Sequence, residues 1–332
     1  MIYGKITLED WRTACVEGEE PESSFESYNL RLFFFGTLYN RDTLQATPDD
    51  TNAKLAADAF LSDPAYGFSR LDGSFTIVYY SENECGVVRD HHGTHYPVYC
   101  HIDGNFATSW QFLEDQLEEN FEPNLVSLST FLQRGILKKN NFALFDVHSL
   151  GAGEKFYMLT ELGYLMPVWA SVKLETQAKV HSMFDSLKER NPSLYEKVAD
   201  DIYCLKRDSV FEHEPKVATE RNPDVETYSR RYGELHAQAI RRRIGHSRRV
   251  GILLSGGYDS GSNLAALRSI YDGQIDSYSV GFKGDAWTEL PMARLMSETF
   301  GTRHHEYEID GTETSALPDI VRFLGEPFME GG

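Results

Sequence analysis

Apolar and polar positions in the last third of the chain alternate between strand-like and helix-like patterns. An apolar run at 250–254 is followed by a turn of glycine and serine residues and then by small and apolar residues from 261 to 267. Further segments of this kind predict a strand at 275–282, a helix at 288–300 that ends at Gly301, and a strand at 303–309. The order β-α-β-α-β with short connections is the rhythm of a doubly wound parallel sheet. Such sheets bind ligands at the carboxyl ends of their strands, where the glycine-rich turn is expected to lie.

Residues 28–110 show a different pattern, with short aromatic and β-branched runs separated by turn residues. The runs predict strands at 29–35, 73–80, 86–89, 96–100 and 105–108. Helical spacing predicts helices at 52–61, 112–117, 128–134 and 225–244, the last between Asp224 and Gly245. The first half is therefore expected to form an α+β sandwich whose tail ends near Trp169, and its pattern alone contains no catalytic constellation.

The turn at 255–260 reads Ser-Gly-Gly-Tyr-Asp-Ser and carries the candidate chemistry of the chain. A glycine loop between a strand and a helix directs backbone N–H groups and the positive helix end at an anion. Two glycines allow close approach to a phosphate, and two serines add hydroxyl donors. Asp259 would repel a bare phosphate, which indicates Mg²⁺ between the two. The loop lacks the lysine of a Walker motif, which disfavours γ-phosphoryl transfer; the alternative is a plain Gly-Gly turn.

Bulk properties narrow the class of protein. A chain of 332 residues allows two domains, and it contains no apolar stretch near the ~20 residues of a membrane span. The start does not resemble a signal peptide, and four scattered cysteines suit a reducing cytoplasm. A net charge of −19 disfavours non-specific nucleic-acid binding. We therefore expect a cytoplasmic protein with no nucleic-acid or membrane partner.

Two charged segments depart from the average. Residues 17–22 are acidic and predict a mobile surface loop. Residues 241–243 and 248–249 are all arginine and lie just before the strand that leads to the glycine turn. They would either help to hold ATP phosphates or an acidic partner, or form a solvated helix end that complements the helix dipole. The adjacent residues His304 and His305 alternate on a strand, so we expect them to be structural and not to share a metal ion.

Several segments, in order and with matching spacing, resemble class B asparagine synthetases. The six residues from Phe35 resemble the N-G-E-I-Y-N segment of their glutamine amidotransferase domain, and S-G-G-x-D-S resembles the pyrophosphate loop of enzymes that cleave ATP between its α and β phosphates. Further matching segments are 71–75, 89–99, 280–282, 301–306 and 324–328.

This resemblance implies a fold, a cofactor set and a domain plan. It implies an α+β sandwich of the Ntn-hydrolase type at 1–168, a linker at 169–224, and an α/β parallel-sheet ATP-pyrophosphatase domain, adenine nucleotide α-hydrolase-like, at 225–332. It also implies ATP and Mg²⁺. The implied binding residues are Leu253, Ser255, Gly256, Gly257, Asp259, Ser260, Val280 and Gly281, with Asp259 as the Mg²⁺ ligand and with Asp259 and Ser255 in catalysis.

Departures from the family pattern change the expected activity. The glutaminases of this family need a cysteine at the first residue, whereas this sequence starts with Met1 and has its first cysteine at Cys15. Phe35 and Thr37 replace the Asn and Glu of N-G-E, no R-H-R-G-P-D segment occurs, and Asp50 alone matches a family carboxylate. We expect the first domain to be inactive towards glutamine and structural.

The family also has an S-G-x-G-x-D-E segment beyond the stretch that this sequence matches, and no such segment occurs here. We expect a longer protein, a second chain that completes the site, or a chain that does not turn over. Glu326 is the one acidic candidate near the acceptor side, and a helix-start role is the preferred interpretation.

Three functions remain open from the sequence. The first is an AMP-forming amide ligase that uses a small-molecule or peptide carboxylate and amine, as in the related β-lactam synthetases and lasso-peptide macrolactam cyclases. The second is an asparagine synthetase that uses free ammonia, and the third is a non-catalytic scaffold. A homodimer is compatible with each of them.

Overall fold

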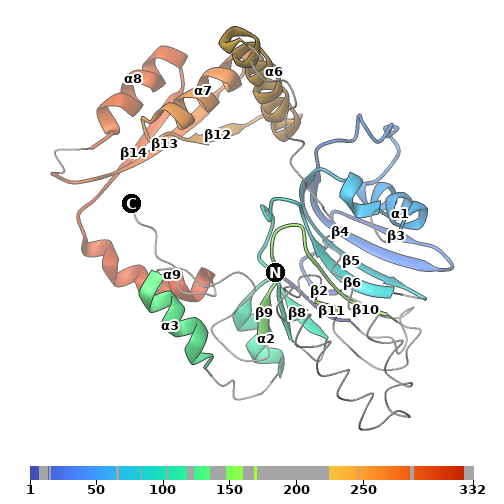
Figure 1. Cartoon of the computed structure of the whole chain (residues 1–332). Helices are drawn as coiled ribbons and strands as arrows, with labels where there is room; N and C mark the ends of the chain where they lie inside the picture. Colours follow the sequence, from blue (N-terminus) through green and yellow to red (C-terminus); the bar gives the residue numbers. More distant parts are fainter. Residues whose placement is uncertain are drawn as a thin grey trace. The chain divides into compact units, whose positions relative to one another are not determined.

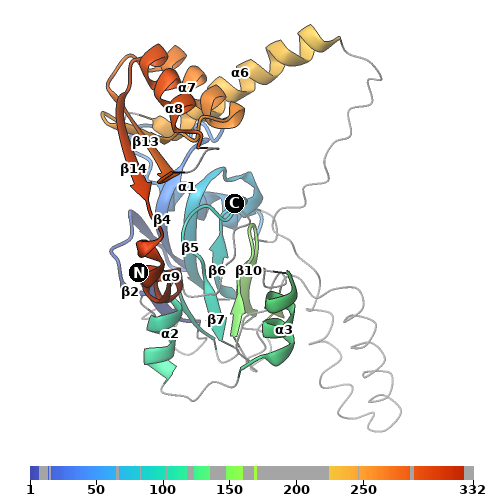
Figure 2. The same ribbon diagram turned by 90° about the vertical axis from the view of Figure 1, so that its left-hand side faces the viewer.

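The computed structural model describes residues 1–6, 14, 16–64, 67–82, 84–101, 104–117, 123–134, 147–159, 168–169, 224–245, 247–284 and 288–324. The chain divides into two compact units, Met1–Glu214 with Ile320–Gly332, and Pro215–Asp319 (Figures 1 and 2). The linker predicted at 169–224 lies outside the described residues, except for its ends.

Two antiparallel sheets form the centre of the first unit. One has the strand order β2-β1-β8-β7-β9 and the other the order β11-β10-β6-β5-β4-β3. The strands are β1 (Ile2–Lys5), β2 (Val16–Gly18), β3 (Ser23–Glu26), β4 (Leu30–Leu38), β5 (Gly73–Ser81), β6 (Glu84–Arg89), β7 (Tyr99–His101), β8 (Asn105–Ala107), β9 (Val147–Ser149), β10 (Lys155–Leu159) and β11 (Val168–Trp169).

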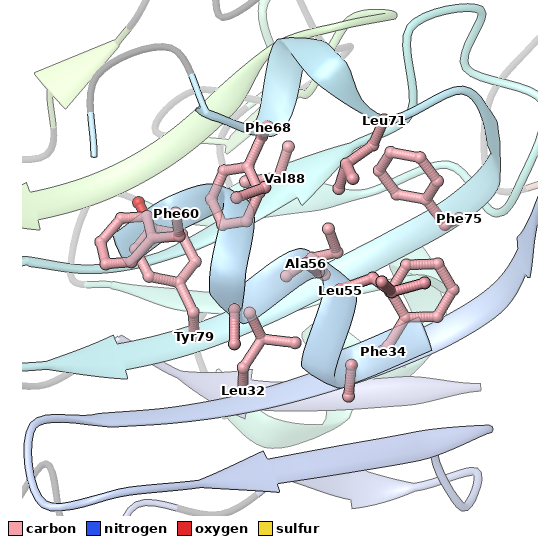
Figure 3. Packing of buried hydrophobic residues seen from close by; sticks show 14 of the residues in the cluster. Leu32, Phe34, Leu55, Ala56, Phe60, Phe68, Leu71, Phe75, Tyr79 and Val88 are labelled. Carbon is pink, nitrogen blue, oxygen red and sulfur yellow. The ribbon is translucent and has the colours of Figure 1, made fainter. Parts of the chain in front are cut away.

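Helix α1 (Asn52–Ser62) and the 3₁₀ turn η1 (Gly67–Arg70) cover one face of the six-stranded sheet. Thr51 caps α1 by accepting a hydrogen bond from the Lys54 N–H. The rings of Phe60 in α1 and Phe68 in η1 meet the ring of Tyr79 beneath the helix, and Phe34 of β4 packs against Phe75 of β5 (Figure 3). Aromatic residues bury large areas, so this contact anchors the helix to the sheet.

A second cluster lies between the two sheets and a third lies beyond the five-stranded one. The middle cluster joins side chains of both sheets, among them Ile2, Val78, Phe106 and Phe156. The outer cluster packs α2 (Trp110–Leu117) through Leu113 against the five-stranded sheet. The layers are thus helix, sheet, sheet and helix, with α3 (Leu125–Arg134) following in the chain. The mixed α/β character predicted for this half is confirmed.

Three details differ from the sequence-based expectations. β1, β2 and β3 were not predicted, because each is short and finds its place only through its partner strand. The acidic segment 17–22 is not simply a loop, because β2 includes Glu17 and pairs with β1. β7 starts at Tyr99 and not at Tyr96, because Pro97 has no N–H for a ladder bond.

A parallel sheet with the order β12-β13-β14 forms the centre of the second unit. Its elements are α6 (Val225–Ile244), β12 (Val250–Leu253), α7 (Tyr258–Ile270), β13 (Ile275–Phe282), α8 (Leu290–Phe300) and β14 (Arg303–Ile309), followed by η2 (Thr312–Ala316). Helix α9 (Leu317–Leu324) comes next in the chain, and its residues from Ile320 onward belong to the first unit. The predicted parallel sheet and its helices are confirmed. The Asp224 cap and the Gly245 end of α6 are also as predicted, and α8 starts at Leu290, two residues later than expected.

Helices α7 and α8 pack on the same face of this sheet, through Leu264, Leu267 and Ala293 (Figure 1). The other face carries exposed apolar and aromatic side chains in the described part, including Leu253, Tyr278, Val280, Phe282 and Tyr307. The second helix layer of a doubly wound sheet is therefore not seen among the described residues. None of the described helices has the length and apolar character needed to cross a membrane.

Candidate functional site

The serine–glycine loop (residues 255–260) connects the carboxyl end of β12 to the first turn of α7. Two serines close this loop. The Ser255 N–H donates to Ser260 Oγ at 3.2 Å, the two hydroxyl oxygens are 3.1 Å apart, and Ser255 Oγ accepts from the Gly257 N–H at 3.3 Å. The same two hydroxyls that the sequence singled out therefore hold the loop in its curved shape.

Glycine at position 256 is required by geometry. Its φ of 93° lies in the left-handed region, and a Cβ there would lie 2.7 Å from the carbonyl oxygen of Glu289. Gly257 is the N-cap of α7 and supplies no side-chain cap to the helix. The first-turn N–H groups of α7 therefore have no capping side chain, which suits an anionic ligand.

Asp259 lies in this first turn and is exposed. Its carboxylate makes no hydrogen bond or ion pair with the part of the chain that the structure describes. Mg²⁺ commonly uses one or two protein carboxylates together with phosphate oxygens and water. The serine–glycine loop, the helix end without a side-chain cap and the carboxylate of Asp259 together fit a magnesium-bound polyphosphate.

The structure places Leu253 and Val280, two of the predicted ATP-binding residues, on one face of the sheet. Leu253 is the register partner of Tyr278, and Val280 lies two residues further along β13, so both side chains point to the open face of the sheet. They are 81% and 66% exposed. Gly281 lies on the opposite face, where a Cβ would meet Leu290 at 2.6 Å. Gly281 therefore leaves room for α8, and its backbone alone would be available to a ligand.

The arginine cluster does not join this loop. Arg241, Arg242 and Arg243 are in the last turn of α6, and Arg248 and Arg249 precede β12, whereas the loop follows that strand. The two sites are thus at opposite ends of β12. Of the two interpretations, the structure favours basic residues that complement the carboxyl end of a helix over a phosphate site.

The two adjacent histidines of β14 face opposite sides of the sheet. His304 Nδ1 lies 2.8 Å from Ser277 Oγ on the helix-covered side. The His305 ring stacks on Tyr278 on the open side, with ring centroids 4.9 Å apart. Each ring thus has a separate packing partner, which supports a structural role for both.

The amidotransferase-like segments have structural roles in the first unit. Phe35 is buried between the two sheets, and Thr37 is exposed at the end of β4. The Asn40 amide donates to the Arg70 carbonyl at 2.8 Å and accepts from the Asp72 N–H at 2.9 Å, which ties two loops together.

The one acidic match in this unit is also engaged locally. Hydrogen bonds from Lys54 and Thr47 hold the pKa of Asp50 well below its ordinary value. Burial raises the pKa of the Cys85 thiol to about 11, so it is not an activated nucleophile. Cys15 and Glu326 lie outside the described residues.

Ser279 is a further residue next to the loop, and no sequence motif indicates its role. It is buried in β13, and its hydroxyl donates to the carbonyl oxygen of Leu254, just before the serine–glycine loop. A serine inside a strand gives no signal in the sequence, because its partner is fixed only by the point at which β12 ends.

A model of the asparagine synthase family matches residues 231–331, a stretch that contains the loop, α7, β13, α8 and β14. Residues 231–331 are thus a segment of the asparagine synthase family. Asparagine synthetases named as glutamine-hydrolysing are similar to it. That of Mycobacterium tuberculosis is 34% identical over 82 residues, which cover 24% of this chain and 12% of the relative. That of Methanocaldococcus jannaschii is 32% identical over 81 residues, with 24% and 16% covered.

A third relative, from Acanthamoeba polyphaga mimivirus, is 30% identical over 106 residues, which cover 31% of this chain and 19% of the relative. The similarity thus spans less than a fifth of the length of these superfamily members. Among solved structures, the glutamine phosphoribosylpyrophosphate amidotransferase of B. subtilis shows 12% identity with a TM-score of 0.33, over 93% of this chain and 76% of that one.

Proposed function

We propose that the second unit binds ATP with Mg²⁺ and activates a carboxylate as its adenylate, so that an amine can form an amide. The observation that carries this proposal is the serine–glycine loop, which follows a parallel strand and opens an uncapped helix inside an asparagine synthase-family segment. Loops of this geometry favour polyphosphates.

The reaction would proceed in two displacements. A carboxylate oxygen attacks the α-phosphorus, the bond to pyrophosphate breaks, and the amine then displaces AMP while losing a proton. The hydroxyls of Ser255 and Ser260 and the backbone of Gly256 and Gly257 would hold the leaving pyrophosphate. Asp259 would hold Mg²⁺, which neutralises negative charge on the phosphates when bound. Leu253 and Val280 would flank the adenine. The protein would contribute to catalysis by positioning the reactants and by stabilising charge.

We further propose that the first unit has an Ntn-hydrolase-like fold and does not hydrolyse glutamine. The support is that Phe35 is buried in the intersheet core and that Asp50 is held by Thr47 and Lys54. An amine from a small molecule or peptide, or free ammonia with aspartate, would then serve as acceptor. The protein would act in the cytoplasm, either within a longer chain or with a second chain or copy that completes the acceptor site.

One observation favours a second candidate, an assembly role without turnover. The open face of the parallel sheet exposes Tyr278, Phe282 and Tyr307, and parallel sheets are usually covered on both faces. A scaffold that associates through this face would keep the fold without needing ATP.

ATP–pyrophosphate exchange with candidate carboxylates tests the ligase proposal. Asp259→Asn should abolish exchange, whereas Asp272→Asn, an exposed residue just after the other end of α7, should leave it intact. ATP binding without exchange would point to a missing part of the acceptor site. An absence of ATP binding in the unaltered protein would overturn the ligase and favour the scaffold.

A further inference from the structure

The last rung between β12 and β13 is made by a side chain. The Leu254 N–H donates to the Tyr278 carbonyl at 2.8 Å, as in a regular parallel ladder. The next bond of that ladder would join the Val280 N–H to the Leu254 carbonyl. The Leu254 carbonyl instead accepts a hydrogen bond from the hydroxyl of Ser279.

The backbone of Val280 consequently lies beyond the last ladder bond between β12 and β13. The Tyr278 carbonyl points to β12, and the Lys283 N–H donates to Ile309 on the β14 side at 2.8 Å. Successive residues of a strand point their backbone groups to alternate edges, so the N–H and C=O of Val280 both point to the β12 side. Neither group has a backbone partner among the residues that the structure describes.

These two groups are a donor and an acceptor on one residue, next to the exposed side chains of Leu253 and Val280. The amidine edge of adenine offers the complementary pair, an acceptor at N1 and a donor at the 6-amino group. We propose that Ser279 is a positioning residue for the nucleotide base, because its hydroxyl occupies the Leu254 carbonyl and so keeps the Val280 N–H available to the ligand. This inference rests on the ATP-binding function proposed above.

The burial of both partners explains why the hydroxyl matters. Ser279 is 5% exposed and Leu254 is 1% exposed, so the carbonyl cannot turn to water if the hydroxyl is removed. A buried carbonyl without a donor is costly, and the backbone donor that a regular parallel ladder would supply is the Val280 N–H. In Ser279→Ala we expect the Val280 N–H to donate to the Leu254 carbonyl. ATP would have to break this hydrogen bond in order to bind the Val280 N–H.

Equilibrium binding of magnesium ATP and magnesium ITP separates this role from a purely structural one. The hypoxanthine base of ITP has a donor at N1 and an acceptor at position 6, the reverse of adenine. Ser279→Ala should weaken ATP binding about five- to tenfold, the equivalent of one hydrogen bond, with a smaller change for ITP. Ser279→Thr keeps the hydroxyl and should restore the preference for ATP.

Ser277→Ala is the matched control. Ser277 lies on the same face of β13 and is also buried, but its hydrogen bonds join it to Thr302 and His304 and not to Leu254. Its loss should lower stability without changing the ratio of ATP to ITP affinity. An equal fall in that ratio for both alanine variants, or none for Ser279→Ala, would overturn the positioning role while ATP binding itself stands.

Amide hydrogen exchange of Val280 gives a readout that needs no nucleotide. The Val280 N–H should exchange quickly in the unaltered protein and more slowly in Ser279→Ala, where it would bond to Leu254. Equal exchange rates in the two proteins would overturn the inference. A protein that binds neither nucleotide, yet shows the expected exchange, would overturn the nucleotide role and the proposed function together.

Discussion

Gly256 and Glu289 fix how closely the serine–glycine loop approaches the next helix of the unit. A Cβ at position 256 would lie 2.7 Å from the Glu289 carbonyl oxygen and 3.1 Å from the Ala293 N–H nitrogen. Glu289 is the residue before α8, so the start of that helix supports the loop from beneath. The position of the serine–glycine loop therefore depends on a helix that starts about thirty residues further along the chain, and not on the loop sequence alone.

Replacement of Gly256 by alanine should disable the loop. The new Cβ would contact backbone atoms, and the residue would have to keep a φ of 93°, a conformation that costs a non-glycine residue about 1–3 kcal/mol. We expect ATP affinity to fall about tenfold or more. Gly251→Ala in β12 is the control, because its Cβ would meet nothing closer than a Tyr278 ring carbon at 3.5 Å. Equal ATP affinities in the two variants would contradict this account.

Lys155 and Glu84 form an ion pair inside the first unit. Their Nζ and Oε1 atoms are 2.9 Å apart, with 2% and 12% of the side chains exposed, and the Tyr79 hydroxyl also donates to Glu84. Lys155→Met leaves the buried carboxylate without its cation, which should cost about 3–5 kcal/mol of unfolding free energy.

The double variant Lys155→Met with Glu84→Gln should recover part of that loss, because no uncompensated charge remains. Urea unfolding of the single and double variants measures both values. A double variant that is less stable than Lys155→Met would show that the carboxylate contributes independently of the lysine.

Long and strongly patterned elements could be predicted from the sequence. β4 and β5 are nine residues each and rich in aromatic residues, and α6 has regular apolar spacing between an aspartate cap and a glycine end. β1 and β2 could not be predicted, because they are four and three residues long and are defined by pairing with each other.

Some features of the candidate site could likewise be predicted from the sequence, and others could not. The chemistry of residues 255–260 is local, so the motif and its place before a helix were evident from the sequence. The role of Ser279 and the opposite facing of Gly281 depend on where β12 ends and where α8 packs. These are tertiary properties with no local pattern.

Thr302 connects β13 and α8 through two short hydrogen bonds. Its hydroxyl oxygen is 2.6 Å from both Ser277 Oγ and Ser297 Oγ, which are buried. Thr302→Val keeps the shape but removes the shared hydroxyl, which should cost about 1–3 kcal/mol. Thr302→Ser should lose less, because it retains the bonds. Thermal unfolding compares the two, and a valine variant as stable as the serine variant would argue against this network.

His95 should make the stability of the first unit depend on pH. Burial lowers the pKa of its ring below the ordinary value of 6.5, although Asp90 and Glu19 partly oppose this shift, and Nδ1 lies 2.9 Å from Thr76 Oγ1. The folded ring resists a proton that the unfolded chain accepts below pH 6.5. The contribution of His95 to the free energy of unfolding is therefore complete above pH 6.5, and it declines as the pH falls towards the lowered pKa of the folded state.

The variant His95→Gln removes the titrating ring from this environment. Urea midpoints of the variant and the unaltered protein, measured at pH values on either side of 6.5, isolate the contribution of His95 from those of the other histidines. The variant should lose less stability on acidification than the unaltered protein, because it has no buried ring at position 95 whose protonation the folded state disfavours. Equal losses in the two proteins would mean that His95 can take up its proton without disturbing the loop around Asp90, for example by turning the ring away from Thr76.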